Sequence, residues 1–211
     1  MDKTTKTIDT YNKTAENFEI KFMDLKLYRE ALNRFIDMLK PGSVILDLGC
    51  GPGNVAKLLV DTQKNFLVTG IDLSPEMVNL ARKNVPEAKF EVGDVRQINV
   101  KEGAYDCIMA AFCLPHLTNE EASALIEKIG LLLRQGGLLY LSCMEGQRSG
   151  YEYTSFSPEN EIFFNYYKEN FLKNHLSANK LELLHLTRQD YPEEDGSTTI
   201  DMIFIAKKDE K

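Results

Sequence analysis

The sequence predicts a single α/β domain: a doubly wound, mostly parallel sheet of seven strands, with N-terminal helices and an antiparallel C-terminal hairpin. Between residues 43 and 143, short apolar runs alternate with longer amphipathic stretches, a rhythm typical of successive strand–helix units. After residue 180, an acidic turn rather than a helix joins two strand-like runs, which indicates a hairpin at the sheet edge. A chain of 211 residues suits one domain with a substantial core.

Residues 8–39 are predicted to form a helical N-terminal cap. Apolar side chains recur there at intervals of three and four residues, which is the period of an amphipathic helix: Phe18, Phe22, Leu25, Ala31, Leu32, Phe35 and Leu39. Pro41 and Gly42 end this region, because proline and glycine seldom continue a helix. The strand–helix core is therefore expected over residues 43–143.

Five apolar runs in this core are the expected strands: residues 43–48, 66–71, 88–92, 105–111 and 138–143. The fourth run is apolar nearly throughout, as a strand covered on both faces should be. A helix over about residues 55–61 is expected after the first strand. Ser74 as N-cap and Pro75 at the first helical position start the helix after the second strand.

A further helix is predicted between the fourth and fifth strands. Thr118 and Glu121 have the spacing of a capping box, and apolar side chains then follow on one helical face: Ala122, Leu125, Ile126, Ile129, Leu132 and Leu133. Gly136 and Gly137 are expected to end this helix.

Beyond the fifth strand, an aromatic-rich insert over residues 145–178 is expected to be helical in its second half. Its aromatic residues Tyr151, Tyr153 and Phe156 either line a pocket or pack the insert onto the sheet, and the sequence leaves both alternatives open. The C-terminal strands, within residues 180–207, complete the single domain that we expect over residues 1–211.

The composition argues against nucleic-acid and membrane partners. The chain carries 25 Lys and Arg against 32 Asp and Glu, whereas nucleic-acid binding depends on basic side chains that neutralise phosphates. The longest apolar run, residues 107–114, is far too short to cross a bilayer, and the N-terminus has no apolar signal-peptide core. We therefore expect a cytoplasmic protein that contacts neither nucleic acid nor membrane.

The cysteines and histidines do not predict a metal site. None of the four cysteines forms a C-x-x-C pair, and the three histidines lack the spacing of known metal motifs. We expect the thiols to be reduced and mostly buried.

The segment Asp47–Gly53, DLGCGPG, is predicted to be a ligand-binding turn. It follows the first strand and opens the first core helix, and ligands of open α/β sheets bind beyond the carboxyl ends of the strands. A dinucleotide fingerprint would require a small residue at position 54, where Asn54 stands, and no phosphate-loop string occurs. The turn is instead an acidic residue followed by G-x-G-x-G.

Two carboxylates follow the next two strands. Asp72, at the end of the second strand, can accept hydrogen bonds from ribose hydroxyls. Its alternative role, capping the next helix, is already filled by Ser74. Asp94 comes two residues after the third strand and can accept a hydrogen bond from an exocyclic adenine amine, with a turn after Gly93 as its alternative.

These motifs together resemble the class I S-adenosylmethionine (SAM) dependent methyltransferases of the small-molecule type. The strings VILDLGCGPGN, GIDLSPEMVNLARKN, FEVGDV, YDCIMAAFCLPHL and LLRQGGLLYLS occur in the family's order, from about residue 44 to residue 143. The resemblance implies SAM as cofactor and S-adenosylhomocysteine (SAH) as product. It also implies cofactor contacts from Tyr11, Asp47, Gly49, Gly51, Asp72, Leu73, Asp94, Val95 and Phe112.

Within that set, the resemblance assigns each residue a part of the cofactor. Asp47, Gly49 and Gly51 would contact the methionine part and Phe112 would lie near it. Asp72 would hold the ribose, Leu73 and Val95 would flank adenine, and Asp94 would reach its amine. Tyr11 resembles an N-terminal tyrosine that closes over the cofactor, the alternative being an exposed tyrosine at a helix start.

The implied activity is methyl transfer to a small-molecule acceptor by in-line displacement. Because the leaving group is already activated, the protein contributes mainly alignment and exclusion of water, and a base is needed only if the acceptor must lose a proton. His116 is the leading candidate base, although the family often carries a histidine there without a chemical role, and Glu145 is undecided.

Two other functions are weighed against this activity. One is a non-catalytic SAM-binding or interaction protein, and the other is a nicotinamide oxidoreductase, which the glycine spacing disfavours. The sequence AAFC at residues 110–113 replaces the polar, proline-rich motif of the nucleic-acid amino-methylating enzymes. Acceptor specificity is expected to lie in residues 8–39 and 145–178, and the oligomeric state is not predicted.

Overall fold

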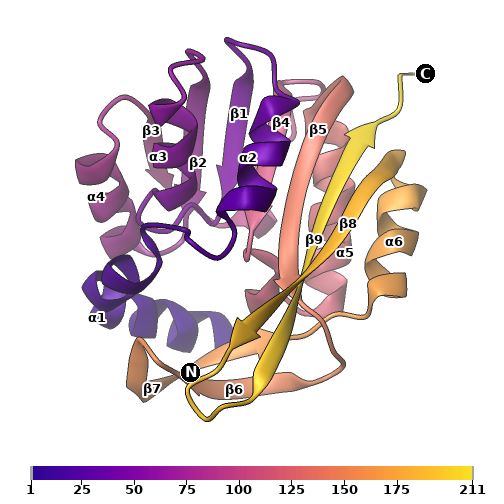
Figure 1. Ribbon diagram of the computed structural model, residues 1–211. Helices are drawn as coiled ribbons and strands as arrows, with labels where there is room; N and C mark the ends of the chain where they lie inside the picture. Colours follow the sequence, from indigo (N-terminus) through magenta and orange to yellow (C-terminus); the bar gives the residue numbers. More distant parts are fainter. Residues whose placement is uncertain (1, 211) are drawn as a thin grey trace.

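The computed structural model describes residues 2–210 and is built around a seven-stranded sheet in the order β3-β2-β1-β4-β5-β9-β8 (Figure 1). The strands are β1 (Val44–Leu48), β2 (Leu67–Asp72), β3 (Lys89–Val92), β4 (Tyr105–Ala111), β5 (Leu133–Met144), β8 (Leu181–Pro192) and β9 (Thr198–Lys208). The first five strands pair in parallel, whereas β9 is antiparallel to both β5 and β8. The predicted fold class is therefore confirmed.

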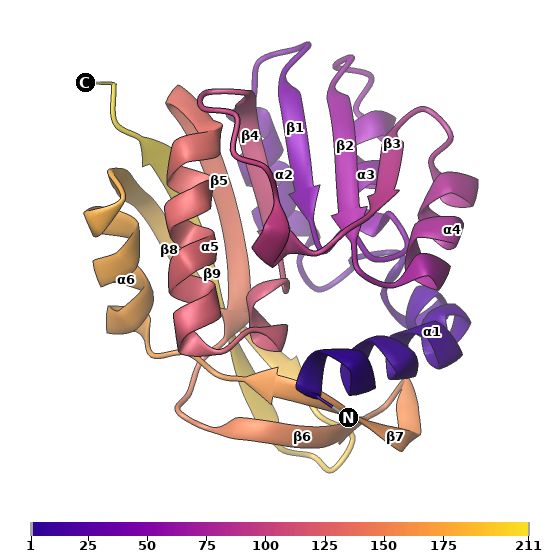
Figure 2. The same ribbon diagram turned by 180° about the vertical axis from the view of Figure 1, so that it is seen from behind.

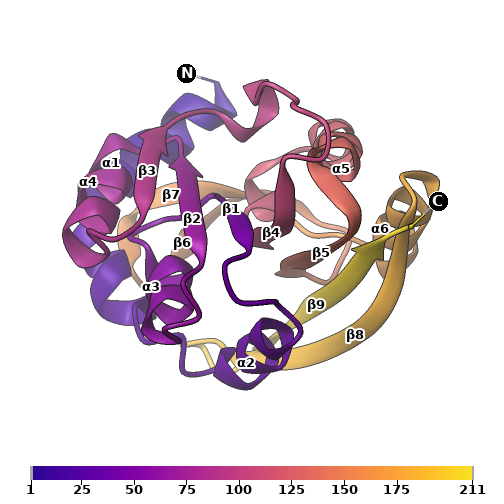
Figure 3. The same cartoon turned by 90° about the horizontal axis from the view of Figure 1, so that it is seen from above.

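Helices cover both faces of this sheet. They are α2 (Arg29–Asp37), α3 (Asn54–Asp61), α4 (Pro75–Asn84), α5 (Asn119–Leu132) and α6 (Glu169–Ala178). Successive residues of β1 point to opposite faces: Ile45 packs in the cluster with α2, α3 and α4, and Leu46 packs in the cluster with α5 and α6. Figure 3 shows α2 and α3 on one side of the sheet and α5 on the other.

A second layer lies across the carboxyl ends of the parallel strands. It consists of α1 (Lys3–Phe22) and the two-stranded sheet of β6 (Ser149–Thr154) and β7 (Ser157–Asn165) (Figure 2). The hydroxyl of Thr10 donates to the Glu161 carbonyl at 3.1 Å, and the hydroxyl of Thr7 accepts from the Phe163 N–H at 3.2 Å. These contacts hold helix and hairpin together opposite the strand ends.

The N-terminal cap consists of two helices, as a helical region allows, but it begins at Lys3 and not at residue 8. Helix α1 begins at Lys3 because Asp2 caps it, accepting from the N–H groups of Thr4 and Thr5. The chain then leaves the helix between α1 and α2, where Leu25 takes a left-handed backbone conformation with φ of 50°.

The expected end of α5 at the two glycines is wrong. The helix stops at Leu132, and Leu133 is already extended and pairs with Tyr105, so Gly136 and Gly137 lie within β5. A Cβ on Gly137 would come 2.9 Å from the Arg134 carbonyl oxygen. The glycines therefore form a tight irregularity of β5, and the helix ends earlier, where Leu133 pairs with Tyr105 as part of the strand.

The helix expected in the second half of the insert is present, but the hairpin before it was not predicted. Residues 149–165 form the hairpin β6–β7, and the helix is confined to α6 at Glu169–Ala178. Side chains of β6 alternate between exposed and half-buried, a period of two that the aromatic composition concealed. The four cysteines are buried free thiols. Among residues 2–210, no helix has both the length and the apolar character needed to span a bilayer.

Candidate functional site

A cavity of about 320 Å³ lies between the carboxyl ends of the strands and the layer formed by α1 and the hairpin β6–β7. Of the residues expected at a site, those that line it are Tyr11, Gly49, Gly51, Asp72, Leu73, Asp94, Val95, Phe112 and His116. Asp47 is the one residue among the expected cofactor contacts that does not line the cavity. The fold thus gathers segments more than 100 residues apart at one edge of the sheet.

The glycine-rich turn presents its backbone to the cavity. The N–H groups of Gly49 and Cys50 both donate to the Ile71 carbonyl, at 2.8 and 3.1 Å, which ties the turn to β2. Gly49 and Gly51 have φ of 68° and 51°, a left-handed region that favours glycine. A Cβ on Gly49 would lie 3.2 Å from the Cys113 Cβ, so a side chain would be both strained and crowded there.

Asp72 is held by backbone donors on both of its oxygens. Its Oδ2 accepts from the Gly51 N–H and its Oδ1 from the Ser74 N–H, each at 2.9 Å. The Ser74 hydroxyl separately caps α4 by accepting from the Met77 N–H at 3.2 Å. Burial raises the pKa of Asp72, against the opposing effect of these backbone donors. Each carboxylate oxygen has a second lone pair that can accept from a ligand.

Asp47 lies inside the sheet rather than on the cavity wall. It is 1% exposed and stands between Gly70 of β2 and Met109 of β4 in the strand register. Its Oδ2 has no hydrogen-bond partner among the described residues. Burial, followed by the nearby Asp72 charge, raises the pKa of Asp47 to about 7. The expected direct contact of Asp47 with the cofactor is therefore not supported by its position.

Asp94 is already paired with a cation. The Arg96 guanidinium donates to both of its oxygens, with Nη2 to Oδ2 at 2.7 Å, and also to Glu121 at 2.7 Å and to the Thr4 hydroxyl at 3.0 Å. Although burial opposes it, this guanidinium holds the pKa of Asp94 below its usual value. Lys3 completes the network by donating to Glu121 at 2.6 Å. The start of α1 is thereby fixed to this end of the cavity.

Tyr11 and His116 form a hydrogen-bonded pair in the cavity wall. The Phe163 carbonyl lies 3.1 Å from Nδ1 of His116, and a carbonyl can only accept, so Nδ1 carries the proton. Nε2 then accepts from the Tyr11 hydroxyl at 3.0 Å. Burial lowers the pKa of His116 to about 4, which keeps the ring neutral. Tyr11 lies in the middle of α1 and is half-buried, so it is not an exposed tyrosine at a helix start.

The far end of the cavity contains residues that the sequence did not reveal. The Tyr28 hydroxyl donates to Oδ2 of Asp201 at 2.6 Å, and the Tyr28 ring lies 5.0 Å from that of Phe112. Asp201 is 2% exposed, and burial raises its pKa to about 7 against the opposing hydrogen bond from Tyr28. The available signal was a carboxylate within the apolar strand β9, TTIDMIFIAKK.

Phe112 has an unusual backbone conformation, which the sequence did not predict either. Its φ is 55°, and its N–H donates both to the Ser142 carbonyl and to the Ser142 hydroxyl, each at 3.1 Å. A bulky residue in this left-handed region costs free energy that the surrounding structure must offset, and such residues concentrate at functional sites.

The aromatic residues of the insert divide between the two predicted roles. Phe156 lines the cavity, stacks on Tyr11 at 5.7 Å and meets Phe18 edge to face at 5.0 Å, and Tyr153 lines the cavity too. Tyr151 does not line it, and the Lys6 ammonium lies 4.1 Å from its ring centre.

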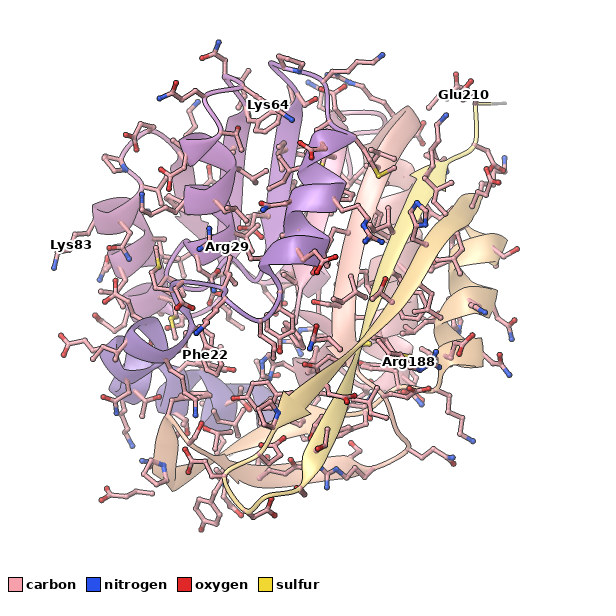
Figure 4. The ribbon with its side chains drawn as sticks, in the orientation of Figure 1. Phe22, Arg29, Lys64, Lys83, Arg188 and Glu210 are labelled. Atoms are coloured by element: carbon pink, nitrogen blue, oxygen red, sulfur yellow. The ribbon has the colours of Figure 1, made fainter. Side chains whose placement is uncertain are left out.

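Glu145 lies outside the cavity and pairs with a basic residue on the sheet edge. Arg188 donates to its two oxygens at 2.7 and 2.8 Å. Figure 4 shows Arg188 on the side of β8 and α6, well away from Phe22, which lies toward α1. Glu145 is therefore part of a surface ion pair.

Comparison with known proteins places this site in a family context. A methyltransferase-domain family model matches residues 45–137, which run from β1 into β5. A trans-aconitate 2-methyltransferase from Enterobacter is 41% identical over 97 residues, which cover 46% of this chain and 37% of that protein. An uncharacterized methyltransferase from Anoxybacillus flavithermus is 34% identical over 110 residues, 52% of this chain and 50% of that protein. The chain spans about half, or less, of the length of the curated relatives it matches.

The fold is shared with solved methyltransferase structures. Magnesium protoporphyrin IX methyltransferase from Synechocystis, crystallised with bound SAM, has a TM-score of 0.73 with this structure. The two chains are 22% identical, and the likeness covers 99% of this chain and 98% of the other. At this identity, the likeness establishes the common fold.

Proposed function

Because the chain carries a class I methyltransferase domain, we propose that it transfers the methyl group of SAM to a small-molecule acceptor bound in the same cavity. The observation that carries this proposal is the extent of the cavity. It runs from Asp72 and Asp94 at one end to Tyr28 and Asp201 at the other, under one cover of α1 and the hairpin β6–β7. Donor and acceptor can therefore lie end to end, as an in-line displacement requires.

The residues at the first end of the cavity fit SAM. Gly49 and Gly51 leave room for close approach to the backbone, and a Cβ at Gly49 would remove that room. Asp72 would accept hydrogen bonds from the ribose hydroxyls with its remaining lone pairs. Leu73 and Val95 would flank adenine, and Asp94, oriented by Arg96, would accept from the adenine amine. SAM, when bound, supplies an activated methyl group.

The methionine end would lie against the turn and Phe112. Asp47 would act there at a distance: its buried carboxylate behind the turn, with one oxygen unpartnered, favours a cationic group on the other side of the turn. Tyr11 would close over the ligand from α1. Its hydroxyl is oriented by His116, whose basic lone pair is engaged, so we assign His116 a positioning role rather than proton transfer.

The rest of the chain would exclude water from the reacting groups. We propose one domain in which the core of residues 43–143 binds the cofactor, α1 and the hairpin β6–β7 cover the cavity, and Tyr28 and Asp201 close the end that takes the acceptor. The aromatic contacts of Tyr11, Phe18 and Phe156 join α1 to the hairpin over the cavity. Exclusion of water from the cavity prevents hydrolysis of the methyl donor and strengthens electrostatic interactions between the groups in the cavity.

Calorimetric titration with SAH, and with NAD as the competing cofactor, tests this proposal first. We expect SAH to bind with micromolar affinity and NAD not to bind. Transfer of a labelled methyl group from SAM into a mixture of small metabolites tests the second step. SAH binding without any transfer would identify a non-catalytic SAM-binding protein, and absence of SAH binding would overturn the assignment altogether.

A further inference from the structure

The half of the cavity beyond Phe112 is acidic and holds no basic side chain. We call this wall the acceptor half; it is formed by Tyr28, Phe112, Ser142, Tyr191, Glu193 and Asp201. Among the cavity-lining side chains within residues 2–210, Arg96 is the single lysine or arginine. It stands at the opposite end, paired with Asp94 and Glu121. The acceptor half is therefore without a cation of its own.

Asp201 is the central group of this wall. One oxygen accepts from the Tyr28 hydroxyl at 2.6 Å, and the other has no hydrogen-bond partner among the described residues. The side chain is nevertheless 2% exposed and faces the cavity. A buried carboxylate with a free oxygen carries a large desolvation cost unless a donor or a cation reaches it.

The titratable groups around Asp201 do not supply that cation. They come from every element packed against it: Tyr28 before α2, Tyr140 and Cys143 on β5, Tyr191 on β8, and Glu193 in the turn between β8 and β9. All of them are neutral or acidic at neutral pH. None of these groups can pair with an ionised Asp201, which leaves its neutralisation to a proton or to a cationic ligand.

Glu193 adds a second carboxylate to the acceptor half, whereas Glu152 is paired with a basic residue. Glu193 accepts from the Thr199 hydroxyl at 2.5 Å and forms no ion pair among the described residues. Glu152 also lines the cavity, but the Arg148 guanidinium lies 3.3 Å from it and the Tyr166 hydroxyl donates to it at 3.0 Å. Arg148 also interacts electrostatically with Glu193, so the negative charge without a nearby cation is that of Asp201, beside the rings of Tyr28, Phe112 and Tyr191.

From this arrangement we infer that the methyl acceptor is a protonated amine, whose ammonium group is held by Asp201 and faced by the aromatic rings of the acceptor half. The inference rests on the proposed methyl transfer and names its substrate class. Carboxylate and ring faces are the two groups that recognise ammonium ions in proteins. A carboxylate-bearing acceptor would meet two negative charges, and a phenol would have to ionise beside them.

The same geometry gives Asp201 a role in the reaction. The ammonium loses one proton to the free oxygen of Asp201, which leaves a neutral amine with a lone pair on nitrogen. That lone pair forms the new N–C bond to the methyl carbon while the C–S bond breaks and its electron pair stays on sulfur. The product is a methylated ammonium together with neutral SAH, and the proton on Asp201 returns to solvent. A carboxyl group with a pKa of about 7 is suited to this exchange near neutral pH.

Three small ligands of one shape test the inference: phenethylamine, 2-phenylethanol and phenylacetate, which are cationic, neutral and anionic at pH 7. Each is titrated by calorimetry into the protein saturated with SAH. We expect phenethylamine to bind about tenfold or more tightly than 2-phenylethanol, and phenylacetate not to bind. Failure of SAH itself to bind would instead strike the proposed function, so the two failures are distinguishable.

Two variants and a control test whether the acceptor half causes the preference for the amine over the neutral ligand. Asp201→Asn keeps the shape and should reduce the affinity for phenethylamine at least about tenfold while leaving that for 2-phenylethanol within about twofold. Glu193→Gln, at a more accessible position, should weaken the binding of phenethylamine by a smaller factor. Asp190→Asn on the exposed face of β8 should change neither. Equal binding of the three ligands, no measurable binding of the amine, or an unchanged preference in both variants would overturn the inference.

Discussion

The two halves of the cavity differ in how far apart their residues lie in the sequence. The end of the cavity proposed for SAM, here called the cofactor half, is built from turns that directly follow β1, β2 and β3, so apart from Tyr11 its residues stand in order between Gly49 and Val95. The acceptor half depends on a hydrogen bond between Tyr28 and Asp201, which are 173 residues apart. Local motifs therefore encode one half, while long-range packing assembles the other.

The halves also differ in how their carboxylates are satisfied. Asp72 accepts from two backbone N–H groups and Asp94 from a guanidinium, so both are stabilised before any ligand arrives. Asp201 has one hydroxyl donor and one free oxygen. A preorganised cofactor half suits a ligand shared by a whole family, whereas an unsatisfied acceptor half leaves its last interaction to a particular substrate.

The largest expected effect comes from removing a carboxylate of the cofactor half. Asp72→Ala should weaken SAH binding roughly 10- to 100-fold, the loss expected for about 1.5–3 kcal/mol of charge-assisted hydrogen bonding. Calorimetry with SAH measures the change, and Asp209→Ala at an exposed position is the matched control. Unchanged affinity in a folded Asp72→Ala variant would refute the ribose assignment.

The next effect concerns stability and sets Asp201 apart from the satisfied carboxylates. Its pKa of about 7 lies above that of an unfolded aspartate, so the folded state binds more protons, and this contribution to stability is lost as the pH rises from about 4 to 7. Asp201→Asn removes the titration. When the pH rises from 5 to 8, the free energy of unfolding of the variant should therefore increase by about 1–3 kcal/mol relative to that of the unchanged protein.

Thermal unfolding of both proteins at the two pH values measures this difference, which corresponds to several degrees in Tm. Comparing the two proteins cancels the contribution of His116, whose lowered pKa acts in the opposite direction below about pH 6.5. A Tm difference that does not change with pH would show that Asp201 titrates normally.

A smaller effect, on ligand binding, distinguishes the two halves of the cavity directly. Tyr28→Phe removes the one hydroxyl bound to Asp201, so the binding of phenethylamine should become weaker by up to about tenfold at pH 6, where the carboxylate is then more protonated. The loss should diminish at pH 8. SAH affinity should stay within about twofold at both pH values, and an equal loss for both ligands would contradict the division of the cavity.

The smallest effect is expected for His116. Its Nε2 already accepts from Tyr11, so His116→Ala should lower kcat only a few-fold, because it loosens Tyr11 without removing a base. Tyr11→Phe should produce a similar loss. A loss of several hundred-fold in His116→Ala with SAH affinity unchanged would restore His116 as the proton acceptor.

Most of the fold could be predicted because its signals are local. The apolar runs, the cap at Ser74 and the capping box at Thr118 all depend on residues within a few positions of one another, and each of these elements is present. The mistakes have a common cause. The hairpin β6–β7 and the strand beginning at Leu133 form because partner segments are available to pair with them, and a single segment does not show its partner.

The sequence by itself determined the sheet, the glycine-rich turn and the carboxylates at Asp72 and Asp94, since strand ends and turns fix these positions within short segments. Only the tertiary structure decided that Asp47 is enclosed, that the basic nitrogen of His116 is engaged, and that Asp201 faces the cavity without a counter-charge. These properties depend on burial and on partners from distant segments. They set the charge and the hydrogen-bonding state of each group, and hence its chemistry.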